Sequence, residues 1–309
     1  MPGMKILITG GTGLLGQALM ATSRSEHQLT ILHRRDYPAG SAGVEPIVLD
    51  ILQAGPLAEV FETQAFDAVI HAAGIASVDY VEQHFEEAWR SNVIGTQHIA
   101  DLARKKDVRL VYVSSNAVFD GKAAPYGERS PTNPINKYGR IKVECEALVT
   151  RLCPEAVIVR PILMYGWHLA EGRANPVTWL LERLRKGEST SLVTDVRENP
   201  LWAHQCAEAI WRILRLGRTG TFHIAGKNVV NRYELGQLVA QVFGLDASLL
   251  RPVDSSFFPS IAPRPHNTSF LTERMECELG LEPFSVLQGL DQMRVLDGAV
   301  PSSGSIAQA

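Results

Sequence analysis

The sequence predicts an α/β protein in which a doubly wound parallel sheet is followed by a smaller C-terminal lobe. In the first half, short apolar runs rich in β-branched residues alternate with helix-length segments. Such runs are typical of strands buried on both faces, and their alternation with helices predicts a parallel sheet. The strands are expected at residues 5–9, 29–32, 46–49, 68–71, 109–113 and 156–159, and the helices at residues 14–21, 86–104 and 134–152.

A glycine-rich turn joins the first predicted strand to the first predicted helix. Gly11, Gly13 and Gly16 match G-x-G-x-x-G, and Gly10, Gly13 and Gly16 match G-x-x-G-x-x-G. Either spacing lets the chain turn sharply, bring backbone N–H groups to a pyrophosphate and pack the helix closely. A plain strand-to-helix turn is the alternative, but the position between strand and helix favours a Rossmann-type dinucleotide site. The contacts expected in this turn are Gly10, Thr12, Gly13, Leu14, Leu15 and Gly16.

The second predicted strand leads into His33-Arg34-Arg35, where a bound dinucleotide would place its adenosine ribose. An acidic residue there would bind the 2′-hydroxyl of NAD, whereas arginine can pair with the 2′-phosphate of NADP. We therefore expect Arg34 and Arg35 to favour NADPH, with NADH as the second option and a solvated basic loop as the alternative. His71 is expected to be packed and hydrogen-bonded rather than catalytic. The other expected cofactor contacts are Asp50, Ile51, Ala72, Ala73, Gly74 and Asn92.

The regular alternation weakens after Pro161, which predicts a change of domain. We expect an NADP-binding Rossmann-type domain over residues 1–165, a substrate-binding lobe over residues 166–300 and a flexible tail over residues 301–309. One strand of the second half, at about residues 220–225, is expected to return to the main sheet. The helices expected in this half are residues 177–186, 203–216 and 233–243.

The composition argues against several classes of partner. The 309 residues carry a net charge of −3, the pI is near 6.3, and no basic run predicts nucleic-acid binding. We expect no signal peptide, and no apolar stretch reaches the ~20 residues of a membrane helix. Four scattered cysteines without metal-ligand spacing predict reduced thiols, no metal site and a cytoplasmic location.

Tyr138 and Lys142 lie four residues apart in a predicted helix, so their side chains share one face. A phenol is a weak acid at neutral pH, but an ammonium group beside it stabilises the phenolate and makes proton transfer feasible. The pair is expected to donate a proton to a carbonyl oxygen as hydride arrives, with Lys142 also holding the nicotinamide ribose. Tyr-x-x-x-Lys alone is more often part of a surface helix, but its place after the dinucleotide turn favours catalysis. Ser114 and Ser115 are both candidates for a second hydrogen bond to that oxygen.

Three segments carry a resemblance to a known family: residues 113–121 (VSSNAVFDG), residues 133–142 (NPINKYGRIK) and residues 264–267 (RPHN). With these motifs the chain resembles the extended short-chain dehydrogenases/reductases. Within that group it is similar to the dTDP-4-dehydrorhamnose reductases and to the regulatory beta subunit of methionine adenosyltransferase. The resemblance spans about residues 5–281 and implies a Rossmann domain followed by a lobe that holds a sugar nucleotide.

The resemblance also implies roles for individual residues. Its register selects Ser115 over Ser114, so the implied catalytic residues are Ser115, Tyr138 and Lys142. Arg264 is expected to contact a diphosphate or a sugar, because a guanidinium group suits bidentate phosphate binding. An ordinary surface salt bridge is the alternative for this arginine.

Three departures from the family pattern fall around the expected sugar site. The usual Asp-Tyr is Asn116-Ala117, the usual tryptophan is Leu163, and the usual Asn-Ser-x-Leu-Asp is the segment 267–271. The proton-transfer residues are retained while the sugar pocket is altered, so we expect unchanged hydride chemistry and a sugar site that differs from the family pattern. The expected substrate contacts are Asn116, Leu163 and Arg264.

The sequence thus leads to one main hypothesis with two alternatives. The main hypothesis is an NADPH-dependent reductase of a 4-keto sugar nucleotide, similar to dTDP-4-dehydrorhamnose reductase. The first alternative is a regulatory subunit that binds NADP without turnover, and the second is a reductase or epimerase of another small ketone. The substrate, the stereochemical outcome and the oligomeric state, a homodimer included, stay open.

Overall fold

The computed structural model describes residues 3–23, 27–34, 44–169, 172–259 and 261–297. Arg35, one of the predicted cofactor contacts, and the predicted tail lie outside these described residues.

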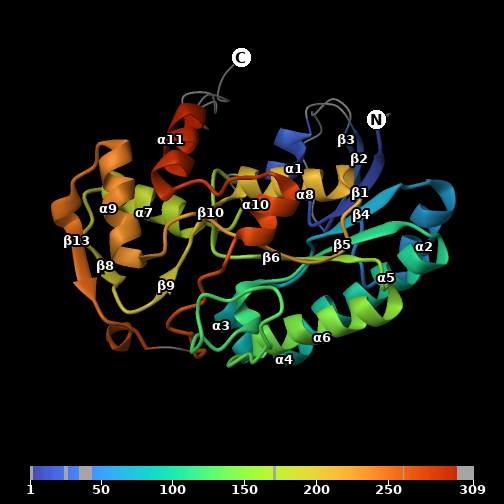
Figure 1. The fold of residues 1–309 in the computed structure, drawn as a ribbon, viewed down its shortest axis with the longest axis horizontal. Coiled ribbons are helices and arrows are strands. Elements are labelled where there is room, and N and C mark those ends of the chain that lie inside the picture. The colour runs from blue at the N-terminus through green and yellow to red at the C-terminus, as the bar shows by residue number, and fades with distance from the viewer. Residues whose placement is uncertain (1–2, 24–26, 35–43, 170–171, 260, 298–309) are drawn as a thin grey trace, which may run out of the picture.

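A seven-stranded sheet with the order β11-β6-β5-β4-β1-β2-β3 forms the centre of the molecule (Figure 1). All neighbouring strands pair in parallel. The chain winds outward from β1 in both directions, so the predicted doubly wound parallel fold is confirmed. The strand β11 comes from the C-terminal half and pairs with β6 at the sheet edge. The seven strands are β1 (Lys5–Thr9), β2 (Gln28–His33), β3 (Val44–Val48), β4 (Ala68–His71), β5 (Arg109–Val113), β6 (Val157–Pro161) and β11 (Gly220–Ile224).

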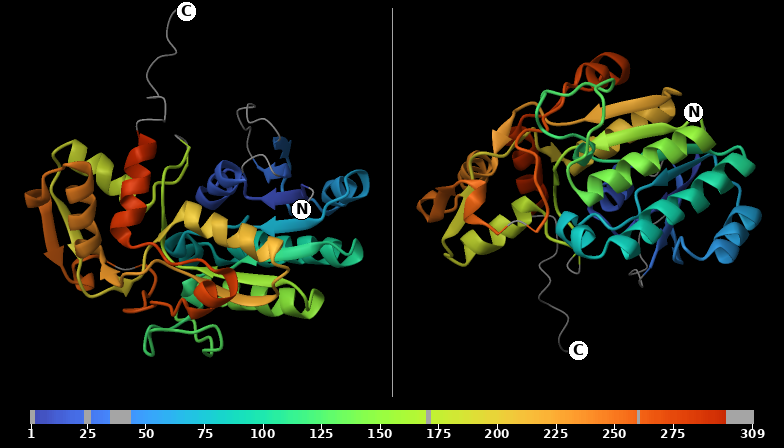
Figure 2. Two further views of the ribbon diagram at one scale, coloured as in Figure 1. Left: turned by 45° about the horizontal axis from the view of Figure 1, so that its top comes forward. Right: turned by 90° about the horizontal axis from the view of Figure 1, so that it is seen from below.

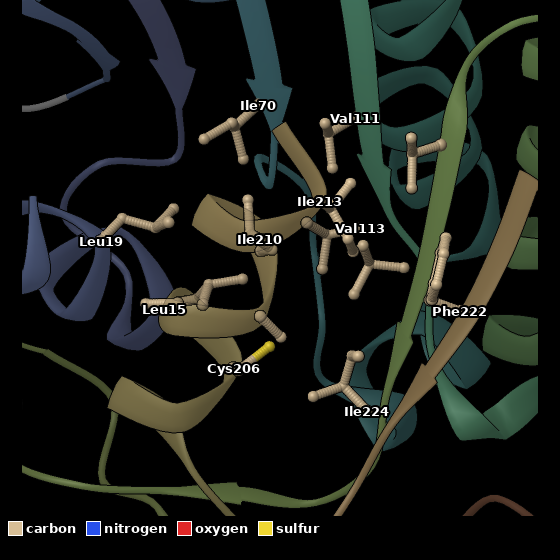
Figure 3. Packing of buried hydrophobic residues seen from close by; sticks show 14 of the residues in the cluster. Leu15, Leu19, Ile70, Val111, Val113, Cys206, Ile210, Ile213, Phe222 and Ile224 are labelled. Carbon is tan, nitrogen blue, oxygen red and sulfur yellow. The ribbon is translucent and has the colours of Figure 1, made fainter. Parts of the chain in front are cut away.

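Both faces of the sheet are buried along its inner strands, which explains why these strands are apolar runs without polar alternation, whereas the edge strand β3 is partly exposed. Helices α1 (Leu14–Thr22) and α8 (Ala203–Arg215) cover one face. Figure 3 shows this packing, with Leu15 and Leu19 of α1 and Cys206, Ile210 and Ile213 of α8 lying against Ile70, Val111, Val113 and Phe222 of the strands. The second face is covered by α2 (Ala54–Thr63), α5 (Gly95–Lys105) and α6 (Lys137–Leu152).

The helix predicted over residues 86–104 is interrupted. It consists of α4 (Phe85–Trp89), a π-helical turn (Arg90–Ile94) and α5. The Asn92 carbonyl in the wide turn accepts a hydrogen bond from Thr96 Oγ1 at 2.5 Å. The Asn92 side chain bonds both the N–H (2.7 Å) and the C=O (3.0 Å) of Ile75. The spacing of apolar residues along the sequence does not reveal such a turn, because the contacts of Asn92 involve polar groups, one of them 17 residues away.

A third hydrophobic cluster forms the core of the smaller lobe, which stands beside the sheet in Figure 1 and in both views of Figure 2. Its helices are α7 (Pro176–Arg185), α9 (Arg232–Phe243) and α11 (Val286–Asp297). Among the described residues, no helix has the length and apolarity needed to cross a membrane. The remaining elements are α3 (Val78–Gln83), α10 (Glu273–Leu279), β7 (Met164–Tyr165), β8 (Thr190–Val193), β9 (Arg197–Glu198), β10 (Leu201–Trp202), β12 (Val230–Asn231) and β13 (Leu250–Val253).

Candidate active site

The glycine turn is tightly packed at the positions of both glycine spacings, because a Cβ at Gly11 would also lie 2.8 Å from Ile31 Cβ. Gly10 has φ +76°, and a Cβ there would lie 2.8 Å from Ala73 N. A Cβ at Gly16 would lie 2.5 Å from the carbonyl oxygens of Gly10 and Gly11, so α1 packs directly on the turn. Gly13 is the N-cap of α1 and provides no side-chain cap. The first N–H groups of α1 therefore have no side-chain acceptor at the cap and are suited to an anion.

A cleft of about 600 Å³ lies over this turn. It opens at the carboxyl ends of β1, β2 and β4, where the winding direction of the sheet reverses. This is the position at which ligands bind to open α/β sheets. Nine of the predicted cofactor contacts line it: Gly10, Thr12, Gly13, Arg34, Asp50, Ile51, Ala72, Ala73 and Gly74.

Other predicted cofactor contacts do not line this cleft: Leu14, Leu15, Gly16, Asn92, Tyr138 and Lys142. Leu15 and Gly16 are buried beneath the turn. Asn92 binds the backbone of Ile75 in the loop after β4. Seven further residues that are not predicted as cofactor contacts also line the cleft: Leu32, His33, Leu49, Ser91, Leu169, Gly172 and Arg173. Leu169, Gly172 and Arg173 come from the segment after β7, and no local pattern predicts that this segment reaches the cleft.

His71 is fully buried between two threonines. Its Nδ1 lies 2.6 Å from Thr9 Oγ1, and its Nε2 lies 3.0 Å from Thr96 Oγ1. Burial, with a further contribution from the Lys142 charge, lowers the pKa of His71 to about 3. The expectation that His71 is packed and hydrogen-bonded is confirmed.

This burial predicts a pH dependence of stability. The folded His71 stays neutral down to about pH 3, whereas the unfolded chain takes up a proton near pH 6.5. Between these values the unfolded state binds more protons, so the unfolding free energy falls as the pH falls. His71→Gln should flatten this slope by up to about 1.4 kcal/mol per pH unit, measured by urea unfolding. The exposed His84→Gln is the control for losing an imidazole, and an unchanged slope in His71→Gln would contradict the expectation.

Tyr138 and Lys142 lie on one face of α6 and are both buried, with 7% and 8% of their surface exposed. Lys142 Nζ lies 5.9 Å from the centre of the Tyr138 ring. The same ammonium group donates to Val113 O at 2.8 Å and to Tyr112 Oη at 3.2 Å. Burial raises the pKa of Tyr112 well above its ordinary value, so its hydroxyl stays protonated beside the ammonium group. Lys142 is thus anchored to the end of β5, one strand away from β4 and the cleft.

The two serines after β5 have different surroundings. Ser114 is buried and donates to Glu146 Oε1 at 2.5 Å, within an ion pair between Glu146 and Arg160. Ser115 Oγ accepts the Ala117 N–H at 3.2 Å and lies 3.2 Å from Asn116 Oδ1. Within the described part of the chain, its hydroxyl is therefore bound by its own turn. α6 lies against this turn, because a Cβ at Gly139 would be 2.1 Å from Ala117 O.

The three predicted substrate contacts are separated in the structure. Asn116 lies beside Ser115 and donates to Glu198 Oε1 and Thr268 Oγ1. Leu163 packs against the core of the smaller lobe, together with Trp167 and Trp202. The Arg264 guanidinium group pairs with Asp79 at 2.9 Å and is 40% exposed, so it forms the surface salt bridge that was the alternative for this arginine.

The parallel sheet, the cleft at its reversal point and the Tyr-x-x-x-Lys pair together define a dinucleotide-binding protein of the short-chain dehydrogenase/reductase class. Comparison with known proteins narrows this class. The chain belongs to the family described as the RmlD substrate binding domain, whose model matches residues 4–295.

Three similar proteins illustrate the family. Methionine adenosyltransferase 2 subunit beta of Danio rerio is 30% identical over 91% of this chain and 86% of that protein. A dTDP-4-dehydrorhamnose reductase of Mycobacterium tuberculosis is 30% identical over 90% of this chain and 88% of that protein. The crystal structure of dTDP-4-dehydrorhamnose reductase from Bacillus anthracis in complex with NADP covers 95% of this chain and 99% of its own, with a TM-score of 0.85 at 23% identity. The predicted resemblance is confirmed, and with it the predicted class, the oxidoreductases.

Proposed function

We propose that this chain reduces a 4-keto sugar nucleotide, dTDP-4-dehydrorhamnose or a relative of it, with NADPH as the hydride donor. The observation that carries the proposal is the buried Lys142 ammonium group, held at the end of β5 beside the Tyr138 ring. Among the described residues this cation bonds neutral oxygens rather than a carboxylate. Such a buried cation is costly, which favours a functional reason for keeping it. The NADP in the Bacillus anthracis structure supports the choice of cofactor.

In this proposal Tyr138 and Ser115 have one role each, whereas Lys142 has two, because it would also hold the nicotinamide ribose. Bound NADPH would supply the hydride, and the cleft over Gly10 and Gly13 has the position and lining to hold its pyrophosphate. Tyr138 donates its phenolic proton to the carbonyl oxygen, and Lys142 stabilises the phenolate that remains. Ser115 donates a hydrogen bond to the same oxygen as negative charge develops on it.

The proposal retains the division of the chain near residue 165, except that α8 packs on the main sheet and β11 belongs to it, and it places sugar-nucleotide binding in the following lobe. Asn116 and Leu163 remain the proposed substrate contacts, whereas Arg264 would first have to leave Asp79. A cytoplasmic location is also proposed, and the four free cysteines support it.

A direct experiment is a screen of NADPH oxidation against a panel of nucleotide-linked keto sugars that begins with dTDP-4-dehydrorhamnose. The true substrate should give kcat/KM of about 10⁴ M⁻¹s⁻¹ or higher. Tight NADPH binding without turnover of any ketone would instead support a regulatory subunit. The similarity to the methionine adenosyltransferase beta subunit is the observation that favours this second candidate.

The cofactor preference gives a separate prediction. Arg34 lines the cleft after β2 and is exposed to it. Arg34→Ala should weaken NADPH binding about tenfold, because one charge-assisted contact to the 2′-phosphate is lost. NADH binding should stay unchanged, and fluorescence titration measures both. The exposed Arg215 of α8 lies outside the cleft, so Arg215→Ala is the matched control. Equal affinities of the unchanged protein for NADPH and NADH would refute the assignment.

A further inference from the structure

The side-chain amide of Asn116 is held in one orientation. Its nitrogen donates to Glu198 Oε1 at 3.0 Å and to Thr268 Oγ1 at 2.7 Å. An asparagine amide has two N–H donors, so both are used. The amide oxygen therefore faces Ser115, whose Oγ donates to it at 3.2 Å.

Glu198, a residue of the smaller lobe, fixes the orientation of the Asn116 amide. It lies on β9, and only 14% of its side chain is exposed. Its second oxygen, Oε2, accepts from Arg232 Nη2 at 2.9 Å. Arginine can only donate and an ionised carboxylate can only accept, so neither contact of Glu198 can be reversed. The hydrogen bonds thus run in a fixed direction from Arg232 to Glu198, and from Ser115 through Asn116 to Glu198.

We infer that Glu198 is a positioning residue that makes this site select a ketone with a hydroxyl group on the neighbouring carbon. The inference rests on the proposed function. When Ser115 turns its hydroxyl to a substrate carbonyl, the Asn116 oxygen loses its donor. A partly buried acceptor left without a donor is unfavourable. A hydroxyl beside the carbonyl replaces the lost donor, because Ser115 Oγ and Asn116 Oδ1 are only 3.2 Å apart.

Glu198 thereby provides a carboxylate beside Ser115 and Asn116, whose turn contains none in this chain. The family pattern leads one to expect aspartate at position 116, where this chain has asparagine. The neighbouring carboxylate is instead supplied by Glu198 of the smaller lobe, 82 residues further along the chain. The pair Asn116–Glu198 therefore joins the end of the sheet to the lobe at the position where the chain departs from the family.

Glu198→Gln tests the inference without changing the size of the side chain. Arg232 can only donate, so the introduced glutamine would direct its amide oxygen toward Arg232 and its amide nitrogen toward Asn116. The Asn116 amide would then have to rotate by about 180° to present its oxygen to this nitrogen. The Asn116 nitrogen would then face Ser115 and could not accept from a substrate hydroxyl. We compare kcat/KM for dTDP-4-dehydrorhamnose with kcat/KM for its 3-deoxy analogue. In Glu198→Gln the ratio of kcat/KM for dTDP-4-dehydrorhamnose to kcat/KM for the 3-deoxy analogue should fall by about tenfold or more. This is the scale expected when a polar contact to a substrate hydroxyl is lost.

The double variant Asn116→Asp with Glu198→Gln exchanges donor and acceptor between the two positions and keeps the net charge. The introduced glutamine would donate to the introduced aspartate, whose other oxygen would again face Ser115 as an acceptor. The ratio should return to within about threefold of the wild-type value. Glu188→Gln is the matched control, because Glu188 pairs with Arg183 at 3.0 Å elsewhere in the lobe. A purely structural role of Glu198 would lower both rates together and would not be rescued by the exchange.

Two results would overturn the inference: a ratio in Glu198→Gln within about twofold of wild type, or no recovery in the double variant. Should the wild type reduce neither ketone, the proposed function fails, and NMR still tests the positioning of Asn116. The exchange of its side-chain amide protons with water should then be slow in wild type. In Glu198→Gln at least one of them should exchange about tenfold faster, since its acceptor is lost, and equal rates would refute the role of Glu198.

Discussion

Tyr138→Phe is expected to lower kcat by about 10²–10⁴-fold while leaving the affinity for NADPH close to that of the wild type. The substitution removes the proton donor but keeps the ring of this residue, which is 7% exposed and packs in the core between the sheet and the helices α2, α5 and α6. Steady-state NADPH oxidation gives kcat, and fluorescence titration gives the affinity. Retention of most of the wild-type rate would show that another group donates the proton.

Lys142→Met is the companion variant and should behave differently. It removes the cation beside Tyr138 and also the hydrogen bonds to Val113 O and Tyr112 Oη. Turnover and cofactor affinity should therefore both fall, since the same ammonium group is proposed to hold the nicotinamide ribose. If only turnover falls, Lys142 acts on Tyr138 alone.

The second large effect concerns stability. Arg160 and Glu146 form an ion pair with a distance of 2.6 Å, and their side chains are only 7% and 9% exposed. Arg160 Nε donates to the same carboxylate at 2.9 Å, which makes the pair bidentate. Arg160→Met should lower the free energy of unfolding by about 3–5 kcal/mol, because Glu146 is left as a buried charge without its counter-ion. Denaturant unfolding at pH 7 measures this change.

A double variant separates the lost pair from the lost packing. Glu146→Gln together with Arg160→Met removes both charges, so it should be less destabilising than the sum of the two single variants. Strict additivity, or a loss below about 1 kcal/mol in Arg160→Met, would mean that the carboxylate finds other compensation.

Local sequence patterns predict the inner strands of the sheet well, because β1, β4, β5 and β6 are short, mostly apolar runs. The predicted runs at residues 68–71 and 109–113 coincide with β4 and β5. The glycine turn is equally predictable, since its geometry depends on contacts among Gly10, Gly13 and Gly16. The interruption of the helix at Asn92 is not predictable in this way, because the Asn92 side chain binds Ile75, 17 residues earlier in the chain.

The candidate site is predictable only where it consists of motifs. Arg34 and Asp50 follow strands and are found from that position, whereas Leu169 and Arg173 reach the cleft through the path of the whole chain. The partners of Asn116 lie 82 and 152 residues away and follow from tertiary packing alone. A single sequence does not encode such pairs in any local period or spacing.

The pairing of β11 with β6 has a consequence for how the protein is made. During synthesis β1 to β6 emerge from the ribosome before α8 and β11. These two later elements complete one face and one edge of the sheet. Until residue 224 has emerged, β6 is an open edge of the sheet, and one apolar face is covered by α1 alone until α8 has followed. Such intermediates are prone to aggregate and are typical clients of chaperones. Chains that end after β6 but before residue 224 should therefore be insoluble, even though they contain the glycine turn, Tyr138 and Lys142.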